Sequence, residues 1–189
     1  MKRLLSLTVL LLSVTLHGFS EEPRPLPLGG FLGIQWGASD DAAKAQIMAR
    51  AKAQYNPKES TEKRLRFDGG EFGGFKAHHF TLAFENGGFH FCETQLVGIT
   101  KNHRKEFLIF KQLLTEKYGP PDQEDQDADN LEATWYFRIP NQPANHISLF
   151  SSPNGPGLRF IYSSEGTKLA RKNAPAPPLN VPARAKEDL

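Results

Sequence analysis

The 189-residue chain carries 23 basic and 21 acidic side chains, a formal net charge of +2 at pH 7. A nucleic-acid-binding protein normally has a surplus of lysine and arginine that displaces phosphate counterions, so this balance argues against nucleic acid as a partner. The chain has a single cysteine, which excludes an internal disulfide bond.

The first twenty residues have the three parts of a secretory signal peptide. Lys2 and Arg3 supply the positive start, residues 4–16 form an apolar run interrupted only by serine and threonine, and residues 18–20 give the small-x-small pattern of a cleavage site. The apolar run is shorter than the roughly 20 residues that span a bilayer as a helix, so we expect its removal rather than a stable membrane anchor. The sequence therefore predicts a bacterial protein that is exported, periplasmic or secreted.

A single folded domain is predicted over residues 31–165. Residues 21–30 form an extended, proline-containing lead-in, and residues 31–37 are a short apolar entry segment with glycines. The remaining residues, 166–189, are rich in proline, alanine and basic side chains and contain no aromatic residue. Such a composition buries too little apolar surface to fold, so a disordered tail is predicted.

Two helices are predicted from apolar side chains that recur at helical spacing. Ser39 is a good N-cap for the first helix, which extends to about Gln54 because Pro57 prevents continuation. The second helix covers residues 105–118, and Gly119 is placed to end it in a left-handed cap.

Strands are predicted wherever apolar and polar residues alternate. The resulting element order is α-β-β-β-α-β-β-β, which is typical of an α+β fold with two helices on one face of an antiparallel sheet. The predicted strands are residues 64–67, a hairpin over 78–97, and residues 131–139, 146–150 and 158–163.

The hairpin turn sets the expected register of two strands. Asn86-Gly87 is the strongest short hairpin signal in the chain, because both positions tolerate positive φ. A two-residue turn there pairs Phe84 with Phe89 and Leu82 with Phe91, so one hairpin face is aromatic and aliphatic. The opposite face is then expected to carry His79, Thr81, His90, Cys92 and Thr94.

Two short motifs and the element order resemble known proteins. Phe31-x-Gly33-x-x-Trp36-Gly37-x-Ser39 before the first helix and Leu114-x-x-Lys117-Tyr118-Gly119-x-Pro121 at the end of the second resemble a pattern in small uncharacterised bacterial exported proteins. The order of a helix and three strands is similar to the architecture of beta-lactamase inhibitory protein and of small outer-membrane assembly lipoproteins. This chain lacks the cysteine that directly follows the signal peptide in the lipoproteins. The resemblance implies an α+β fold and assigns a function to no residue.

The most site-like stretch is an acidic segment ahead of the fourth strand. Asp125, Asp127 and Asp129 occupy every second position, as in the opening of an EF-hand loop, and their carboxylates are ligands that calcium prefers. The pattern then departs from an EF-hand, because Asn130 stands at the glycine position and Tyr136 at the position of the bidentate glutamate. Calcium binding and an ordinary solvated acidic loop are the two interpretations, and no other cofactor is predicted.

Other reactive side chains give no complete site in the sequence. His79, His90 and Cys92 share a hairpin face in the expected register, but the two histidines pair with residues four apart, roughly 13 Å by strand rise, so they cannot hold one zinc or copper ion together with the cysteine. No serine lies in a Gly-x-Ser-x-Gly elbow. The glycine-rich residues 69–74 lack the Lys-Ser/Thr ending of a phosphate-binding loop.

These observations favour an exported, non-enzymatic binding module that recognises another protein or a component of the cell envelope. An antiparallel sheet covered on one face leaves its other face free as a platform. An inhibitor of a secreted hydrolase is one version of this hypothesis, by analogy of fold alone. The alternative is a secreted or periplasmic metal-binding protein or a hydrolase. The platform is expected to contain His79, Thr81, His90, Tyr136 and Arg138.

Overall fold

A computed structural model of the chain describes residues 28–98, 100, 102–127, 130–138, 140–152 and 157–173. These residues form three helices and two antiparallel sheets. The helices are α1 (Asp40–Arg50), α2 (His103–Tyr118) and α3 (Glu165–Lys172). The strands are β1 (Gly30–Phe31), β2 (Ile34–Gln35), β3 (Gln54–Tyr55), β4 (Arg64–Asp68), β5 (Glu71–Phe72), β6 (Phe75–Glu85), β7 (Gly88–Leu96), β8 (Gln123–Gln126), β9 (Leu131–Phe137), β10 (Asn145–Ser151) and β11 (Arg159–Ser164).

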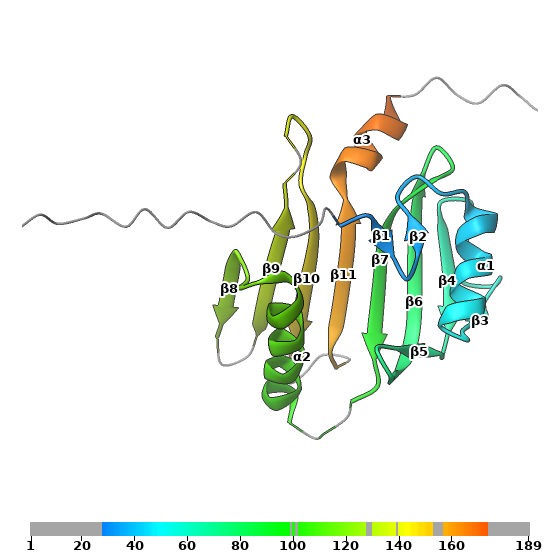
Figure 1. The fold of residues 1–189 in the computed structure, drawn as a ribbon. Helices are drawn as coiled ribbons and strands as arrows, with labels where there is room; N and C mark the ends of the chain where they lie inside the picture. The colour runs from blue at the N-terminus through cyan, green and yellow to red at the C-terminus, as the bar shows by residue number, and fades with distance from the viewer. Residues whose placement is uncertain are drawn as a thin grey trace, which may run out of the picture.

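The main sheet has the strand order β3-β4-β6-β7-β11-β10-β9-β8, with β5 paired to β6 (Figure 1). Strands β4, β6 and β7 form one meander, and β9, β10 and β11 form another. The two meanders meet through their last strands, because β7 pairs with β11. A helix precedes each meander, so the predicted order of a helix and three strands occurs twice. The α+β class and the antiparallel sheet are confirmed.

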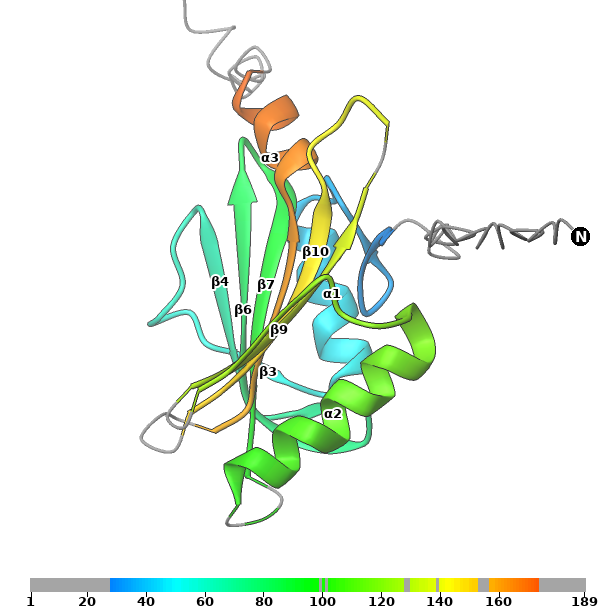
Figure 2. The ribbon, with the colours of Figure 1, turned by 90° about the vertical axis from the view of Figure 1, so that its left-hand side faces the viewer.

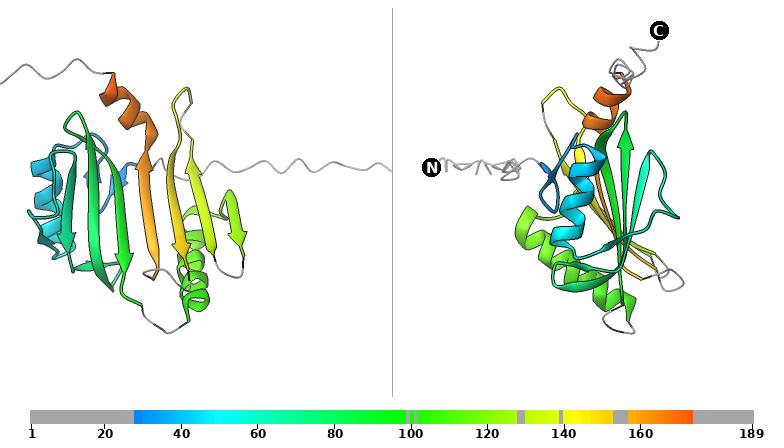
Figure 3. Two further views of the ribbon diagram at one scale, coloured as in Figure 1. Left: turned by 180° about the vertical axis from the view of Figure 1, so that it is seen from behind. Right: turned by 90° about the vertical axis from the view of Figure 1, so that its right-hand side faces the viewer.

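Helices α1 and α2 and the β1–β2 hairpin all lie on one face of the main sheet, and the chain's core is between these two layers (Figure 2). Seen from behind, the other face shows its strands without a helix of the described residues in front of them (Figure 3). The core combines many aromatic side chains with leucine and isoleucine. Its largest fully buried side chains include Trp135, Phe67, Phe80, Phe89, Phe107 and Phe160.

Helix α1 begins where the sequence predicts it and ends earlier. The Ser39 hydroxyl accepts a hydrogen bond from the Ala42 amide at 3.3 Å, which caps the first turn. The helix stops at Arg50, and Lys52 adopts a φ of +55°, outside the helical region. The following residues pair with β4 as β3, so the predicted continuation to about Gln54 is wrong.

Helix α2 packs its predicted stripe against the sheet. Phe107, Phe110 and Leu114 are buried, and Asn102 caps the helix by accepting a hydrogen bond from the Lys105 amide at 3.0 Å. Gly119 is the C-cap, as the sequence predicts, and has a φ of +80°. Its ψ of −176° lies outside the left-handed helical region, so the predicted left-handed conformation is wrong.

The predicted apolar entry segment is the β1–β2 hairpin. Phe31 lies against Tyr162 with ring centroids 4.8 Å apart, and Trp36 stacks on Phe89 at 5.1 Å. The Trp36 indole also donates to the Leu28 carbonyl at 2.6 Å. This hairpin therefore closes the core between α1 and α2 (Figure 1).

Helix α3 is a correction, because the sequence predicts two helices and places a disordered tail from residue 166. The Ser164 side chain caps α3, and the Arg171 guanidinium donates to the Gly37 carbonyl at 2.9 Å. Asn86 at the hairpin tip donates to the Arg171 carbonyl. These polar contacts hold α3 without a buried apolar face, so the apolar spacing that marks α1 and α2 is missing. Residues 174–189 of the predicted tail, the signal peptide and most of the lead-in lie outside the described residues.

Four additional short strands and β8 also differ from the predicted order. Strands β1, β2, β3 and β5 have two residues each, too few to show a period of two. Strand β8 consists of the residues Gln-Glu-Asp-Gln, all exposed, at the edge of the sheet. An edge strand without an apolar side chain gives no alternation to read, and its charges protect the edge from further pairing.

Candidate binding surface on the open sheet face

The sheet face opposite α1 and α2 is the candidate binding surface, and we call it the open face. Strands alternate their side chains between the two faces, so the pairing register identifies the residues that share it. Three rows of side chains cross the open face at right angles to the strands. They are Arg64, Ala83, Phe91, Ser163, His146 and Tyr136; then Arg66, Thr81, Glu93, Ile161, Ser148, Thr134 and Gln123; then Asp68, His79, Gln95, Arg159, Phe150, Glu132 and Asp125.

A β-bulge in β7 decides which hairpin residues reach this face. The turn at Asn86 and Gly87 forms with positive φ at both residues, and Phe84 pairs with Phe89 as predicted. Leu82 then pairs with Cys92 and not with Phe91, because β7 contains one extra residue at the register shift. The predicted register is therefore wrong beyond the first pairs. The bulge turns Cys92 and Thr94 into the core and brings Phe91, Glu93 and Gln95 to the open face.

Arginine, hydroxyl and carboxylate groups form a network at the β4 side of the open face. Arg66 donates from Nη1 to the Thr81 hydroxyl at 3.3 Å and from Nε to Asp68 Oδ1 at 3.4 Å. Glu59, in the loop before β4, places a carboxylate oxygen 3.7 Å from the same Nε. These three partners fix the direction of the guanidinium, so a ligand would meet an oriented cation.

Glu93 lies in the middle row and is held in its ionised form. His79 Nε2 is 3.9 Å from Glu93 Oε1, and this imidazole contributes most to a pKa of Glu93 below its usual value. Partial burial acts in the opposite direction, and the charges of Arg159 and Arg64 lower the pKa further. The centre of the open face therefore carries a negative charge between cationic neighbours.

The half of the open face formed by β9, β10 and β11 is more aromatic. The Tyr136 and His146 rings lie 6.0 Å apart, and the Arg159 guanidinium lies 4.8 Å from the centre of the Phe150 ring. Between these two pairs the Thr134 and Ser148 hydroxyls share a hydrogen bond of 2.8 Å. Aromatic and arginine side chains of this kind supply much of the binding energy at protein interfaces.

Two histidines flank the start of α3 at one end of the open face. Burial is the main cause of a pKa below the usual value for both His90 and His146, and the nearby Glu165 carboxylate partly offsets it. Lys168 lowers the pKa of His90 further. Glu165 accepts a hydrogen bond from the Ser163 hydroxyl at 3.2 Å and lies 3.5 Å from the Lys168 ammonium. Both imidazoles are therefore kept neutral near pH 7.

The five residues predicted for the platform do not all share one surface. His79, Thr81 and Tyr136 lie on the open face, in three different rows. His90 is the extra residue of the β7 bulge, is only 9% exposed, and has no hydrogen-bond partner for Nδ1 among the described residues. Arg138 follows the end of β9 and is exposed.

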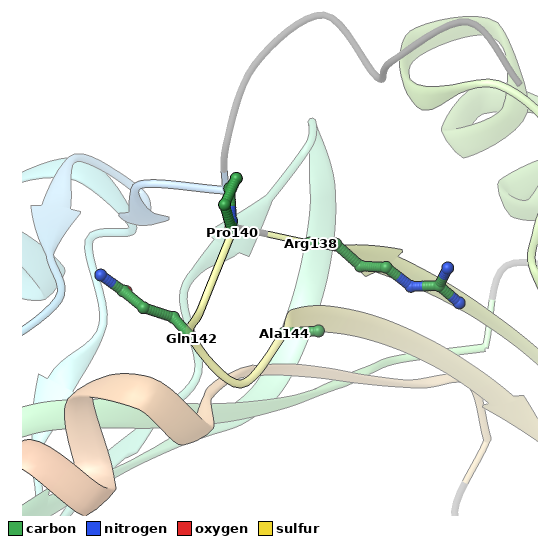
Figure 4. A pocket seen from close by; sticks show the side chains of 4 residues that line it. All are labelled: Arg138, Pro140, Gln142 and Ala144. Carbon is green, nitrogen blue, oxygen red and sulfur yellow. The ribbon is translucent and has the colours of Figure 1, made fainter.

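The loop between β9 and β10 forms a shallow pocket around Arg138, which Pro140, Gln142 and Ala144 also line (Figure 4). All four residues come from this one loop, and Figure 4 shows the Arg138 and Gln142 side chains pointing in opposite directions. A ligand site needs polar groups that converge, so this pocket offers a weaker candidate than the open face.

The acidic segment begins as strand β8 and not as a loop. Asp125 pairs with Glu132 of β9, and Asp125 and Asp127 are both exposed, while Asp129 lies outside the described residues. Glu124 points to the other face, where it forms an ion pair with Lys111 of α2. Among the described residues, no group of three or more His, Cys, Asp and Glu side chains is arranged to hold a metal ion.

Cys92 and Ser163, two candidate nucleophiles at the open face or next to it, are poorly activated. Cys92 is fully buried, and burial together with the neighbouring Glu93 raises the pKa of its thiol well above the usual value. A buried thiol in its neutral form is a poor nucleophile. Ser163 donates its hydroxyl to Glu165 and is itself buried.

Sequence reasoning missed several side chains of the open face. Arg159 and Ile161 alternate with the core residues of β11, so the period of two in residues 158–163 was sufficient to place them together. Phe91 and Glu93 reach the open face only because of the bulge, and neither residue carries a local signal for it.

Comparisons with protein-family models, with curated proteins and with solved structures each found no match to this chain. In the part of the chain that the structure describes, no helix has the length and apolar character needed to cross a bilayer.

Proposed function

We propose that the protein is an exported, non-enzymatic binding module that recognises another protein or a cell-envelope component through its open face. One observation carries the proposal. The face of the main sheet that no helix of the described residues covers (Figure 3) combines partly exposed aromatic and aliphatic side chains with charged groups held in fixed directions. Sheet faces in compact domains are usually covered or uniformly polar, so this mixture favours a partner.

The chemistry of the open face supports a protein-like partner. Phe91, Ile161 and Phe150 lie in three different rows and are only partly buried, so they offer apolar contact area across the middle of the sheet. Arg66 and Glu93 already have their directions set by neighbouring side chains. Pre-oriented groups lose little conformational entropy when a partner binds, which makes their contacts more effective.

The state of the potential nucleophiles supports a non-enzymatic role. Cys92 faces the core as a neutral thiol, and the Ser163 hydroxyl donates to a carboxylate, whereas a catalytic serine would donate to a neutral base. The thiol packs in the core, and the hydroxyl is held in a hydrogen bond within the fold. Because Cys92 faces the core and not the open face, Cys92→Ala is expected to leave partner binding unchanged.

Recovery of partners from a native envelope fraction tests this proposal. The immobilised mature protein is compared with the variant Ile161→Arg, which puts a long cation in the middle of the open face. Met48→Arg is the matched control, because Met48 is an exposed apolar residue of α1 on the helix side. We expect the unmodified protein and Met48→Arg to retain the same partner and Ile161→Arg to lose it. Equal recovery by Ile161→Arg, with an unchanged melting temperature, would show that the open face is not the binding surface.

A further inference from the structure

The surface of α2 that faces away from the sheet carries several exposed large apolar side chains. Leu108, Ile109 and Leu113 are 45%, 38% and 47% exposed, whereas the inner surface of the same helix is buried on the sheet. At 100° per residue these three side chains lie around Gln112 on the side of the helix that points away from the core. The result is a group of three exposed apolar side chains around Gln112 on one helix, which we call the α2 patch.

Opposite charges mark the two ends of the α2 patch. Lys105 lies one turn before it and Glu116 lies one turn after it, and both are exposed on the same outward ridge. One oxygen of Glu116 accepts a hydrogen bond from Gln112 of the same helix at 2.9 Å. Two neighbouring cations have partners outside the patch. Arg104 donates to Gln126 of β8 at 3.3 Å, and the Lys117 ammonium lies 5.0 Å from the centre of the Tyr118 ring.

This arrangement is complementary to itself in one orientation. A two-fold axis that passes between residues 110 and 111 and runs two α2 helices antiparallel places Leu108 opposite Leu113 and Ile109 opposite Gln112 of the second copy. The same axis places Lys105 opposite Glu116, and it does so twice because the contact is isologous. A parallel arrangement would instead bring like charges together at both ends of the patch, which is unfavourable.

We propose that the α2 patch is the interface of a homodimer in which two α2 helices pack antiparallel about this axis. The dimer covers the apolar side chains and pairs the charges at both ends. Within one chain, α2 lies on the side of the main sheet opposite the open face (Figure 2). The dimer therefore places the two helix layers against each other, and the open faces of both copies point outward. The proposal is independent of what the open face binds.

Charge exchange across the axis tests the dimer. Lys105→Glu converts both expected ion pairs into like-charge pairs, and the double variant Lys105→Glu/Glu116→Lys restores both pairs with their signs reversed. Neither change should harm the fold, because an acidic residue in the first turn and a basic residue in the last turn of a helix are favourable to the helix dipole. Lys63→Glu, an exposed lysine in the loop before β4, makes the same change in net charge away from α2.

Sedimentation velocity over a range of protein concentrations gives the dimer dissociation constant of each mature protein. We expect a measurable dimer for the unmodified protein and for Lys63→Glu, a dissociation constant raised about tenfold or more for Lys105→Glu, and recovery to within about threefold for the double variant. A monomer at every concentration, or no effect of Lys105→Glu, would overturn the proposal. So would a monomer that binds vesicles of anionic phospholipid through the α2 patch, because the occupant would then be a lipid surface.

Discussion

The β7 bulge determines the composition of the open face, and a pair of single-cysteine proteins tests it. The first protein is unmodified and contains only Cys92, which the structure places in the core. The second is Phe91→Cys/Cys92→Ala, which moves the single thiol by one residue onto the open face. Replacing the buried cysteine by alanine is expected to cost about 1 kcal/mol, so both proteins should remain folded.

The expected difference in thiol reactivity is large. Cys92 is fully buried, so it reacts with a polar thiol reagent only when the structure opens. A domain with a typical stability of about 5 kcal/mol or more spends less than roughly one part in 10³ of its time unfolded. A cysteine at position 91 is reached from solvent without unfolding. The ratio of the two reaction rates should therefore be about 10³ or larger.

The assay follows release of thionitrobenzoate from Ellman's reagent at neutral pH, with each protein also measured in denaturant as a reference for full exposure. We expect the thiol at position 91 to react on the time scale of a free thiol and Cys92 to react far more slowly, with equal rates in denaturant. If Cys92 reacted within about tenfold of the displaced thiol, the bulged register would be wrong and the open face would contain different residues.

Three further changes have expected results. Both His90 and His146 have a folded-state pKa below the usual value of 6.5, so the unfolded chain takes up protons first as the pH falls. Stability is therefore lost from about pH 6.5 down through the folded-state pKa values. The urea midpoint should fall between pH 7.5 and pH 5.5 for the unmodified protein and fall less for His90→Gln/His146→Gln, and parallel declines of the two proteins would contradict this. Trp135→Phe and Trp36→Phe each remove an indole that donates to a main-chain carbonyl, but only Trp135 is fully buried. Chemical denaturation should therefore show a loss of about 2–3 kcal/mol for Trp135→Phe and about 1 kcal/mol for Trp36→Phe, and equal losses would contradict the burial assigned to Trp135. If the acidic segment is an ordinary edge strand, the melting temperature should be the same in millimolar calcium as in a calcium chelator. A melting temperature that rises with calcium and then saturates would establish the calcium-binding interpretation.

Local sequence patterns predict the larger elements of this fold because each pattern has a local cause. Ser39 and Asn102 cap the two predicted helices, and Gly119 ends the second. Asn86 and Gly87 form the predicted turn because both adopt positive φ. These features depend on a few neighbouring residues, so a sequence read alone is sufficient for them.

The parts that the sequence does not predict depend on contacts between distant residues. Pairing of β7 with β11 joins the two meanders, and no local pattern says which strands will meet. Helix α3 is held by Arg171 and Asn86, which are 85 residues apart, and it lacks an apolar stripe. The acidic residues of β8 become a strand because β9 offers a free edge.

The candidate site was predicted only in part for the same reason. His79, Thr81 and Tyr136 reach the open face because alternation is regular from His79 onward in β6 and along β9. In β7 the alternation is interrupted by the bulge at His90. Every later residue of β7 therefore points to the sheet face opposite the one predicted. A single extra residue in one strand therefore changes the chemistry at the centre of the surface, where Glu93 replaces the expected cysteine.

The most direct test of the central claim is site-specific photo-crosslinking in cells that produce the protein. A benzophenone amino acid is placed at Phe91 or Tyr136 on the open face, or at Ala45 on the exposed side of α1. The binding module proposed here should give one crosslinked partner in common from both open-face positions and none of that partner from Ala45. The same partner captured at Ala45, with neither open-face position giving a crosslink, would contradict the claim that this face is the recognition surface.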